Sequence, residues 1–498
     1  MTTPPLVSQL PVHEHYAAEY FELAHLLPIS SENGTMLVAV AGEADADALD
    51  DLRHFFDVTL EFQAVSEEVL SDAIRRTYAA QESVIELVRD LDTHIAGANV
   101  DFDAPLADVR DLASQPPVIR FVNLLIREGH DASASDIHLE ATREGLRARM
   151  RVDGVLSDLP TPPASLQAAI ISRIKLLAEL DIAERRVPQD GRIRVRLESR
   201  ELDIRVSTVP TLVGESVVLR LLDRGGGAIS LDQLGMGADV FGEFARLAQQ
   251  PHGIVLATGP TGSGKTTTLY AALGLRRPGQ EKIITVEDPV EYHLGGVTQV
   301  PVHTKAGVTF ASALRSILRQ DPDVLMVGEM RDPETAGIAI QAAMTGHLVF
   351  STLHTNDAVS ALSRLKDLGV KPYMIAATLE GVLAQRLVRR ICTDCREPYV
   401  PEPGVLALTG GIARPGTQLV RGRGCDRCRQ TGFRGRVGLF ELLVLREEIR
   451  DELLAQSAMP VLRERARSLG MVSLMEDGWR KAQAGLTTVE EVLRVVQN

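Results

Sequence analysis

Residues 259–266 read Gly-Pro-Thr-Gly-Ser-Gly-Lys-Thr, and this stretch decides the fold. It matches the phosphate-loop pattern G-x-x-x-x-G-K-[ST], with an apolar strand-like run at 254–257 before it and a helix-like segment after it. The glycines of such a loop let backbone N–H groups wrap the β-phosphate, and the helix N-terminus adds partial positive charge. The stretch therefore predicts nucleotide binding, and a chance match in a glycine-containing turn is the alternative.

Two side chains of the loop have predicted chemical roles. We expect Lys265 to neutralise β- and γ-phosphate oxygens and the Thr266 hydroxyl to hold Mg²⁺. The predicted nucleotide-binding residues of the loop are Gly259, Pro260, Thr261, Gly262, Ser263, Gly264, Lys265, Thr266 and Thr267.

Around the loop, the pattern is that of a parallel α/β sheet. From Gly253 onward, apolar runs at 254–257, 283–286, 324–327 and 348–351 alternate with helical segments. A cysteine-containing segment at 392–428 interrupts this order, and a helical region begins near Arg446.

Two further α/β units are predicted before the loop. Residues 1 to about 95 contain a buried strand at 36–40 and an amphipathic helix at 70–87, and a linker is expected at 93–105. The next unit opens with a helix at 118–129. Strands follow at 146–152, ending in the Asp153-Gly154 turn, and at 192–197, 202–206 and 217–222. The triplet Gly225-Gly226-Gly227 is predicted to be a hinge.

The bulk composition limits the class of protein. A chain of 498 residues is too long for one hydrophobic core, so several domains are expected. The net charge of −14 argues against a chain whose whole surface tracks nucleic-acid phosphates. No apolar run reaches the roughly 18 residues that span a bilayer, and the start Met-Thr-Thr-Pro-Pro does not resemble a signal peptide. We therefore expect a cytoplasmic protein.

Acidic residues follow two of the predicted strands. Glu329 comes after the strand at 323–327, where a carboxylate at the strand end can orient the attacking water. Gly328 stands where a magnesium-holding Asp is usual, so Glu329 is predicted to serve the metal, the water or both. A second cluster, which begins with Glu287, spans 287–291 at the end of another strand. A solvated loop acid or a helix cap is the alternative for either cluster.

Two histidines flank the run at 348–351. His354 lies at the strand end, where it can meet the γ-phosphate, whereas the functional interpretation is weaker for His347. The alternative for each is a structural hydrogen bond.

The four cysteines of the chain form two C-x-x-C pairs, Cys392 with Cys395 and Cys425 with Cys428. This spacing suits a tetrahedral Zn²⁺ with four thiolates, and such a closed site is structural rather than catalytic. Disulfides are a weaker interpretation for a cytosolic protein, and a redox pair needs only one C-x-x-C.

The same region is unusually rich in arginine. Residues 386–436 contain eleven arginines and four acids, within an acidic protein. A solvated face that balances acidic neighbours is the plain interpretation. The functional alternatives are contact with anionic lipid and a contact to the nucleotide of a neighbouring subunit.

Taken together, the motifs resemble a known family. The phosphate loop, Thr-Val-Glu-Asp-Pro at 285–289, the stretch from 319 to 329 and the stretch from 345 to 355 look like four boxes of the secretion and pilus ATPase superfamily. In order, they resemble its Walker A, Asp, Walker B and His boxes. The stretches 135–138 and 185–192 are similar to the domain that precedes the motor in that family.

The resemblance implies a homohexameric ring that converts ATP hydrolysis into domain rotation. It also implies phosphate contacts by Arg205 and Arg220 in the preceding domain, and by Arg315 and Arg319 in the motor. The spacing of the second pair is i, i+4, which places both on one face of the helix expected before the Walker B strand. Family members dock through the N-terminal region onto the cytoplasmic part of an inner-membrane platform.

The predicted fold class is a multidomain α/β protein with a RecA-like P-loop ATPase core. The expected parts are a docking domain at 1–95, a PAS-like α/β domain at 106–224, the ATPase core at 232–390, a zinc segment at 391–440 and a helical domain at 441–498. ATP, Mg²⁺ and Zn²⁺ are the expected cofactors.

The predicted function is ATP hydrolysis that drives pseudopilus assembly and protein export in type II secretion. The four-cysteine segment favours an assembly motor over a retraction motor, and the length favours secretion over pilus extension, which is the nearest alternative. A zinc-bearing nucleic-acid translocase is a rival from another class, although 4% aromatics and the negative charge argue against nucleic acid as a partner. A non-hydrolysing nucleotide sensor is a third, weakened by Glu329.

Overall fold

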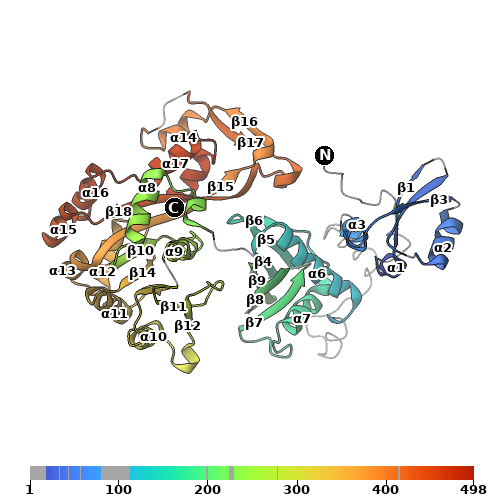
Figure 1. The fold of residues 1–498 in the computed structure, drawn as a ribbon, viewed down its shortest axis with the longest axis horizontal. Helices are drawn as coiled ribbons and strands as arrows, with labels where there is room; N and C mark the ends of the chain where they lie inside the picture. Colours follow the sequence, from blue (N-terminus) through green and yellow to red (C-terminus); the bar gives the residue numbers. More distant parts are fainter. Residues whose placement is uncertain are drawn as a thin grey trace. The chain divides into compact units, whose positions relative to one another are not determined.

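The structure is a computed structural model that describes residues 18–32, 34–42, 44–56, 58–79, 113–197, 200–223, 229–276, 279–412 and 416–497. The chain divides into two compact units, one of residues 1–197 and 203–221 and one of residues 198–202 and 222–498 (Figure 1). The predicted linker at 93–105, the Gly225–Gly227 hinge and the end of the predicted helix at 70–87 lie outside the described residues.

The first unit begins with a small three-stranded sheet. Its strands β1 (Leu26–Glu32), β2 (Thr35–Val40) and β3 (Thr59–Ala64) lie in the order β1-β2-β3, with β1 antiparallel and β3 parallel to β2. Helices α1 (Ala18–Leu23), α2 (Ala46–Phe56) and α3 (Glu67–Ala79) accompany it. The predicted strand at 36–40 is confirmed as β2, and its buried side chains share a core with Phe21 and Leu52.

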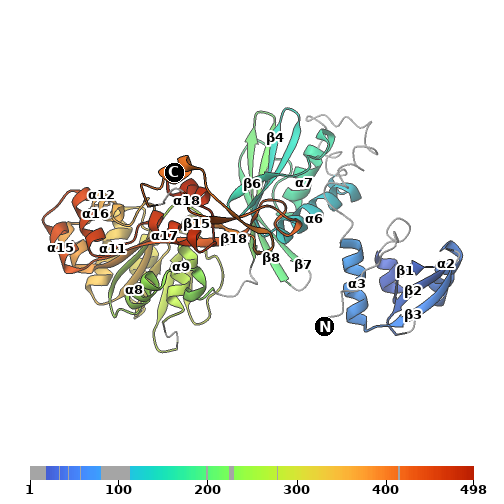
Figure 2. The same cartoon turned by 90° about the horizontal axis from the view of Figure 1, so that it is seen from above.

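A six-stranded sheet forms the rest of this unit. Its order is β6-β5-β4-β9-β8-β7, built from β4 (Ala134–Thr142), β5 (Gly145–Val152), β6 (Val155–Asp158), β7 (Gln189–Leu197), β8 (Arg200–Thr211) and β9 (Gly214–Asp223). Helices α6 (Pro116–Asp131) and α7 (Gln167–Leu177) pack beside each other against it (Figure 2). The predicted helix at 118–129 and the predicted strands are confirmed. Asp153 and Gly154 turn the β5–β6 hairpin with φ of 49° and 83°.

The second unit is built on a seven-stranded sheet in the order β12-β11-β13-β14-β10-β15-β18. Strands β10 (Gly253–Thr258), β11 (Ile283–Glu287), β13 (Val324–Val327) and β14 (Leu348–Leu353) confirm the four predicted runs. They are mutually parallel, and their carboxyl ends meet at one edge of the sheet. Sequence analysis did not identify β12 (Thr298–Pro301), β15 (Leu379–Ile391) or β18 (Phe433–Val444).

Helices cover both faces of this sheet, which explains why the parallel strands β10, β11, β13 and β14 are buried along their whole length. On β10, Ile254 and Leu256 belong to the core under α10 (Phe310–Ile317), α11 (Pro333–Met344), α12 (Ser360–Asp367), α13 (Pro372–Thr378), α15 (Glu447–Leu454) and α16 (Met459–Ser468). Val255 and Ala257 belong to the core under α8 (Ala238–Ala248) and α9 (Lys265–Leu273). Successive side chains of a strand point to opposite faces, so a doubly covered strand needs no polar positions.

The cysteine segment connects β15 to its antiparallel neighbour β18. It contains α14 (Pro403–Ala407) and a two-stranded sheet of β16 (Arg396–Tyr399) and β17 (Leu419–Gly422). Helices α17 (Leu474–Gln483) and α18 (Val489–Val496) pack on this segment around Trp479, the only tryptophan of the sequence. Strand β18 belongs to the seven-stranded sheet and crosses residue 440, where the sequence places the border between the zinc segment and the helical domain.

Candidate nucleotide-binding site

The phosphate loop has the predicted setting, between the end of β10 and the start of α9. Gly262 and Gly264 adopt φ of 78° and 87°, a conformation that favours glycine. At Gly259, a Cβ atom would lie only 2.4 Å from the carbonyl oxygen of Gln385. The backbone contact at Gly259 therefore leaves no room for a side chain, and the conformations of Gly262 and Gly264 favour glycine.

Lys265 points back into its own loop. Its Nζ donates to the carbonyl oxygens of Gly259 at 2.7 Å and Pro260 at 3.0 Å, and the side chain is buried. Burial lowers the pKa of Lys265 to about 8, Glu329 opposes this shift, and Arg386 adds to it. An anionic ligand would stabilise the charged form and raise this pKa again.

Polar groups of the loop fit a phosphate. The Ser263 hydroxyl oxygen is buried and, among the described residues, has no hydrogen-bond partner. The Thr266 hydroxyl at the start of α9 likewise makes no hydrogen bond within the described part of the chain. Buried polar groups are normally paired, so the unpaired Ser263 hydroxyl fits a site that binds phosphate oxygens, while the half-buried Thr266 hydroxyl is accessible to a ligand.

Glu329 and His354 meet at the same edge of the sheet. Glu329 follows β13 and His354 follows β14, the strand between β13 and β10. His354 Nε2 lies 3.4 Å from Glu329 Oε2, and Arg331 Nε lies 2.6 Å from that oxygen. Burial and the charge of Lys265 lower the pKa of His354. The predicted carboxylate and histidine are thus brought together beside the phosphate loop.

Glu287 also lies at this edge, but it is enclosed. Its side chain is 2% exposed and accepts hydrogen bonds from Tyr270, Thr285 and Gln299. It is therefore not a solvated loop acid, and its catalytic role stays a prediction. His347 lies at the other end of β14, where Nδ1 is 2.9 Å from the carbonyl oxygen of Ala342, as a structural histidine would be.

The predicted arginines fall into two groups. Arg315 pairs with Glu334 and is half exposed. The prediction that Arg319 continues the same helix is wrong, because α10 ends at Ile317. Arg319 lies in the following turn, where its Nη1 donates to the carbonyl oxygen of Arg315 at 3.0 Å.

The other two arginines belong to the first unit. Arg220 on β9 donates to Asp136 at 2.8 Å and lowers the pKa of that carboxyl against the opposing effect of burial. Arg205 lies half buried on β8. Contacts of all four arginines with nucleotide remain predictions.

Sequence reasoning missed two residues next to the loop, Gln385 and Arg386 of β15. Gln385 accepts a hydrogen bond from Thr268 of α9 at 2.7 Å. Arg386 is buried and donates to the carbonyl oxygens of Asn356 at 3.0 Å and Val495 at 3.3 Å. The sequence places Arg386 only within the arginine-rich region 386–436. Nothing in the local sequence pattern predicts that Arg386 is buried while arginines near it are exposed.

The four cysteines form one cluster, with all Sγ atoms within 4.8 Å of one another. The Cys392–Cys425 and Cys395–Cys428 pairs are 3.9 Å apart. A zinc tetrahedron with Zn–S bonds of about 2.3 Å has sulfur separations of about 3.8 Å, whereas a disulfide needs about 2.05 Å. Burial raises the pKa of Cys428, but backbone N–H groups of Cys425 and Gly432 outweigh it and hold the value at about 7. The donor set and spacing fit Zn²⁺.

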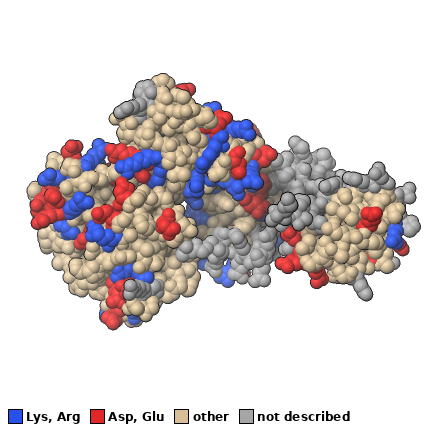
Figure 3. All heavy atoms as spheres, turned by 45° about the horizontal axis from the view of Figure 1, so that its top comes forward, with Lys and Arg blue, Asp and Glu red and all other residues tan. Residues whose placement is uncertain are grey.

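The arginines of this region are partly neutralised by acids. Arg389 bonds Glu491 at 2.6 Å, Arg421 bonds Glu397 at 2.8 Å, and Arg427 bonds Asp394 at 3.2 Å. Others that remain exposed are Arg390, Arg396, Arg423 and Arg434. Figure 3 shows basic and acidic side chains intermixed over the face it displays, which is the arrangement expected of a balanced, solvated surface.

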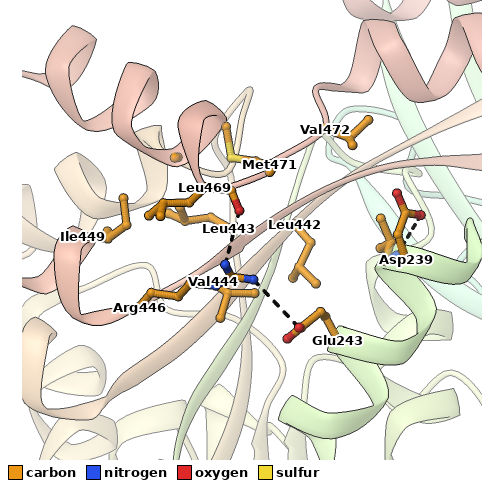
Figure 4. A pocket seen from close by; sticks show the side chains of 13 residues that line it. Asp239, Glu243, Leu442, Leu443, Val444, Arg446, Ile449, Leu469, Met471 and Val472 are labelled. Carbon is orange, nitrogen blue, oxygen red and sulfur yellow. Dashed lines mark hydrogen bonds and ion pairs between the residues drawn. The ribbon is translucent and has the colours of Figure 1, made fainter.

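A pocket of about 360 Å³ lies away from the phosphate loop, between α8, the end of β18 and the end of α16 (Figure 4). Leu442, Leu469 and Met471 contribute apolar walls, and Arg446 reaches toward Glu243 at 3.9 Å across its rim. Arg446 and Glu243 are thus engaged with each other, and Asp239, which also lines the pocket, pairs with Arg480 at 2.9 Å. None of the described helices is long and apolar enough to cross a membrane.

Comparisons with known proteins agree with this site. The family model described as "Type II/IV secretion system protein" matches residues 111–494, and a MshEN domain model matches residues 7–84. The type II secretion system protein E of Xanthomonas campestris pv. campestris is 44% identical over 498 residues, 100% of this chain and 87% of that protein. The protein of the same name from Pseudomonas aeruginosa is 46% identical over 92% of each chain. The type IV pilus assembly ATPase PilB of Myxococcus xanthus is 40% identical over 94% of this chain and 83% of its own.

Solved structures give the same fold. The pilus retraction motor PilT with bound ADP is 26% identical, with a TM-score of 0.52 over 75% of this chain and 96% of its own. The ATPase DotB of Legionella pneumophila, at 21% identity, has a TM-score of 0.57 over 80% of this chain and 100% of its own, a likeness of fold alone.

Proposed function

The chain belongs to the type II/IV secretion system protein family, and from this premise we propose that it hydrolyses ATP to drive pseudopilus assembly and protein export in type II secretion. The observation that carries the proposal is the arrangement at one sheet edge. A buried Lys265 in a phosphate loop and a Glu329 carboxylate two strands away influence each other electrostatically. Binding of phosphate and activation of water need these two groups side by side.

The residues of the site have the following proposed roles. The loop 259–267 holds the phosphates through its backbone N–H groups, and Lys265 turns from its own loop carbonyls to the phosphate oxygens. The Thr266 hydroxyl would hold Mg²⁺, and the bound ion would supply charge neutralisation at these oxygens. Glu329 orients the attacking water, and His354, which lies against it, contacts the γ-phosphate.

Phosphoryl transfer spreads negative charge over three equatorial oxygens, and one lysine does not stabilise all of it. The family resemblance extends the proposed phosphate contacts to Arg205, Arg220, Arg315 and Arg319. Arg315 can leave Glu334 at little cost, because an exposed ion pair contributes about 0–1 kcal/mol. We therefore propose that hydrolysis requires a homohexameric ring that brings these arginines to the nucleotide.

Other proposed properties concern assembly and location. The four cysteines hold one structural Zn²⁺ per chain, which stabilises the segment between β15 and β18. Residues 1–95 dock onto an inner-membrane platform from the cytoplasmic side, and the match to a MshEN domain supports a partner role for this region. The exposed arginines of the zinc segment supply contacts to anionic lipid. We propose the ranges 106–224, 232–390, 391–440 and 441–498 for the remaining domains.

Type IV pilus extension is a second candidate, favoured by the 40% identity to a pilus assembly ATPase. The motor site described above serves either machine, so the choice depends on the platform protein. Co-purification with a type II secretion platform rather than a pilus platform would support the first candidate.

The catalytic proposal is tested with Glu329→Gln. This change should reduce turnover about 10²–10⁴-fold, because it removes a positioned base, and should leave ATP binding within a few-fold. Glu448→Gln, an exposed acid on α15, is the matched control and should be neutral. Near-native turnover in Glu329→Gln would assign the role to another carboxylate.

A further inference from the structure

A buried hydrogen-bond cluster surrounds Glu287, at the end of β11. Tyr270 Oη donates to Glu287 Oε2, while Thr285 Oγ1 at 2.5 Å and Gln299 Nε2 at 3.1 Å donate to Oε1. Both carboxylate oxygens are thus held by neutral donors. Tyr270 and Glu287 are 1% and 2% exposed, so water does not compete for these bonds.

The donors come from three separate elements. Tyr270 lies on α9, one turn after Thr266, while Thr285 precedes Glu287 on β11 and Gln299 lies on the neighbouring strand β12. Gln299 Nε2 is also 3.3 Å from Tyr270 Oη and 3.1 Å from the carbonyl oxygen of Tyr292. The cluster therefore joins the phosphate-binding helix to the end of β11 and to the loop after it.

The Tyr270 phenol is suited to hold a carboxylate. Burial and the bond to Glu287 raise the pKa of Tyr270 well above its usual range, so it remains a donor at any working pH. Its ring packs edge-on against Tyr292, with centroids 4.7 Å apart and planes at 85°. The ring is thus fixed by packing, and its hydroxyl is fixed by Glu287.

We propose that Tyr270 is a positioning residue for ATP hydrolysis: it couples the phosphate-binding helix α9 to Glu287, so that phosphates bound at the start of α9 set the place of this carboxylate. The inference rests on the proposed ATP hydrolysis and on the catalytic role that the sequence predicts for Glu287. A carboxylate held between α9 and β12 cannot move independently of the phosphate loop, whereas a solvated acid could.

The alternative is that Tyr270 only fills the core under α8 and α9. The two interpretations differ in what the hydroxyl contributes. If Tyr270 is a core residue, Tyr270→Phe keeps the ring and changes stability alone. If it positions Glu287, the same change lowers kcat while the affinity for ATP is maintained, since the phosphate loop itself is untouched.

Three single variants of the full-length protein make the test. Tyr270→Phe should lower kcat about 10- to 100-fold, the range expected for losing a hydrogen bond to a charged group, with ATP affinity within about twofold. Tyr292→Phe is the matched control: it removes the same hydroxyl from the adjoining ring, and within the described residues that hydroxyl bonds nothing. Its kcat should stay within about twofold of native. Glu287→Gln should lose turnover.

The double variant Tyr270→Phe with Glu287→Gln decides whether the two residues act together. If Tyr270 acts through Glu287, the double variant is no slower than Glu287→Gln alone. Additive losses, or native kcat in Tyr270→Phe beside an inactive Glu287→Gln, overturn the coupling and leave the role of Glu287 intact. Native turnover in Glu287→Gln overturns that role and, with it, the inference.

Folding is checked separately, by thermal unfolding of each variant. If Tyr270→Phe does not fold, Gln299→Met removes the donor to the other carboxylate oxygen while approximately conserving volume. A folded Gln299→Met with reduced kcat and native ATP affinity supports the cluster as a positioning device, and native kcat refutes it.

Discussion

ATP binding should depend on pH through Lys265, because the nucleotide-free site holds this side chain in an unfavourable environment. Burial lowers its pKa from 10.5 to about 8, against the partial offset from Glu329. A bound triphosphate favours the charged amine and should return the pKa above this value. Binding above pH 7 must then be accompanied by proton uptake.

The size of the effect follows from the shift. With a pKa of about 8, the protonated fraction of Lys265 falls from about nine tenths at pH 7 to about one tenth at pH 9. If only the charged form binds, the apparent Kd should rise about tenfold over this range. At pH 8 about half a proton should be taken up per ATP, because half of the amine is then neutral.

Isothermal titration calorimetry at pH 7, 8 and 9, in buffers that differ in ionisation enthalpy, measures the apparent Kd for ATP and the number of protons taken up. His354 does not interfere, because burial and Lys265 keep its pKa below 6.5, and phosphate groups titrate near pH 6. Lys265→Arg is the control, since arginine stays charged throughout and its binding should be flat with pH. A pH-independent Kd without proton uptake in the native protein would refute this account of Lys265.

In the nucleotide-free protein, Lys265 lowers the stability of the fold. Its folded-state pKa of about 8 lies below the unfolded value of 10.5, which means that folding disfavours the charged amine. Since Lys265 is a base with a lowered pKa, this penalty is fully present below pH 8 and is relieved as the pH rises from 8 toward 10.5. Bound nucleotide should remove this contribution to the pH dependence of stability.

Three other predictions follow from the cysteine cluster and the arginines. Elemental analysis should find one zinc per chain. The variant Cys392→Ser should lower the zinc content and the thermal stability more than the ATP affinity, since structural zinc supplies folding energy. Protein without zinc, whose cysteines form disulfides, would contradict this prediction. If Arg315 serves a neighbouring subunit, mixing inactive Lys265→Ala chains with inactive Arg315→Ala chains should restore part of the ATPase activity. The specific activity of the native protein should rise with protein concentration, and a fully active dilute monomer would exclude the ring requirement. Vesicles with anionic lipid should stimulate ATPase activity in a salt-dependent way whereas DNA should not; strong stimulation by DNA would revive the translocase interpretation.

Much of the seven-stranded sheet was predictable, because strands that are buried on both faces appear in the sequence as short apolar runs. The runs that became β10, β11, β13 and β14 contain few polar side chains, and a glycine or a titratable residue stands at or directly after each end. β15 was missed because it follows α13 without a turn. β18 begins with the exposed stretch 433–436, which looks like a loop, and its pairing with β15 is visible only in three dimensions.

The site was predictable to the extent that its chemistry is local. The phosphate loop, Glu329, His354 and the four cysteines each stand in a short motif, and the structure brings them to the places that the motifs imply. The enclosure of Glu287 could not be predicted, because its donors Tyr270 and Gln299 lie 17 and 12 residues away on other elements. Arg386 illustrates the same limit, since its burial depends on partners that lie far along the chain.

The bond between Arg386 and Val495 has a consequence for the order in which a nascent chain matures. These residues are separated by 109 positions, so the arginine beside the phosphate loop leaves the ribosome well before the helix whose carbonyl it binds. At translation rates of about 5–20 residues per second, that interval lasts on the order of 5–20 seconds. During this interval, strands β10 to β15 have been synthesised, but the guanidinium of Arg386 lacks the carbonyl oxygen of Val495 as an acceptor. Chains that end before α18 should therefore bind ATP more weakly than the full chain, and a fusion attached next to α18 should disturb the nucleotide site more than one attached before α1.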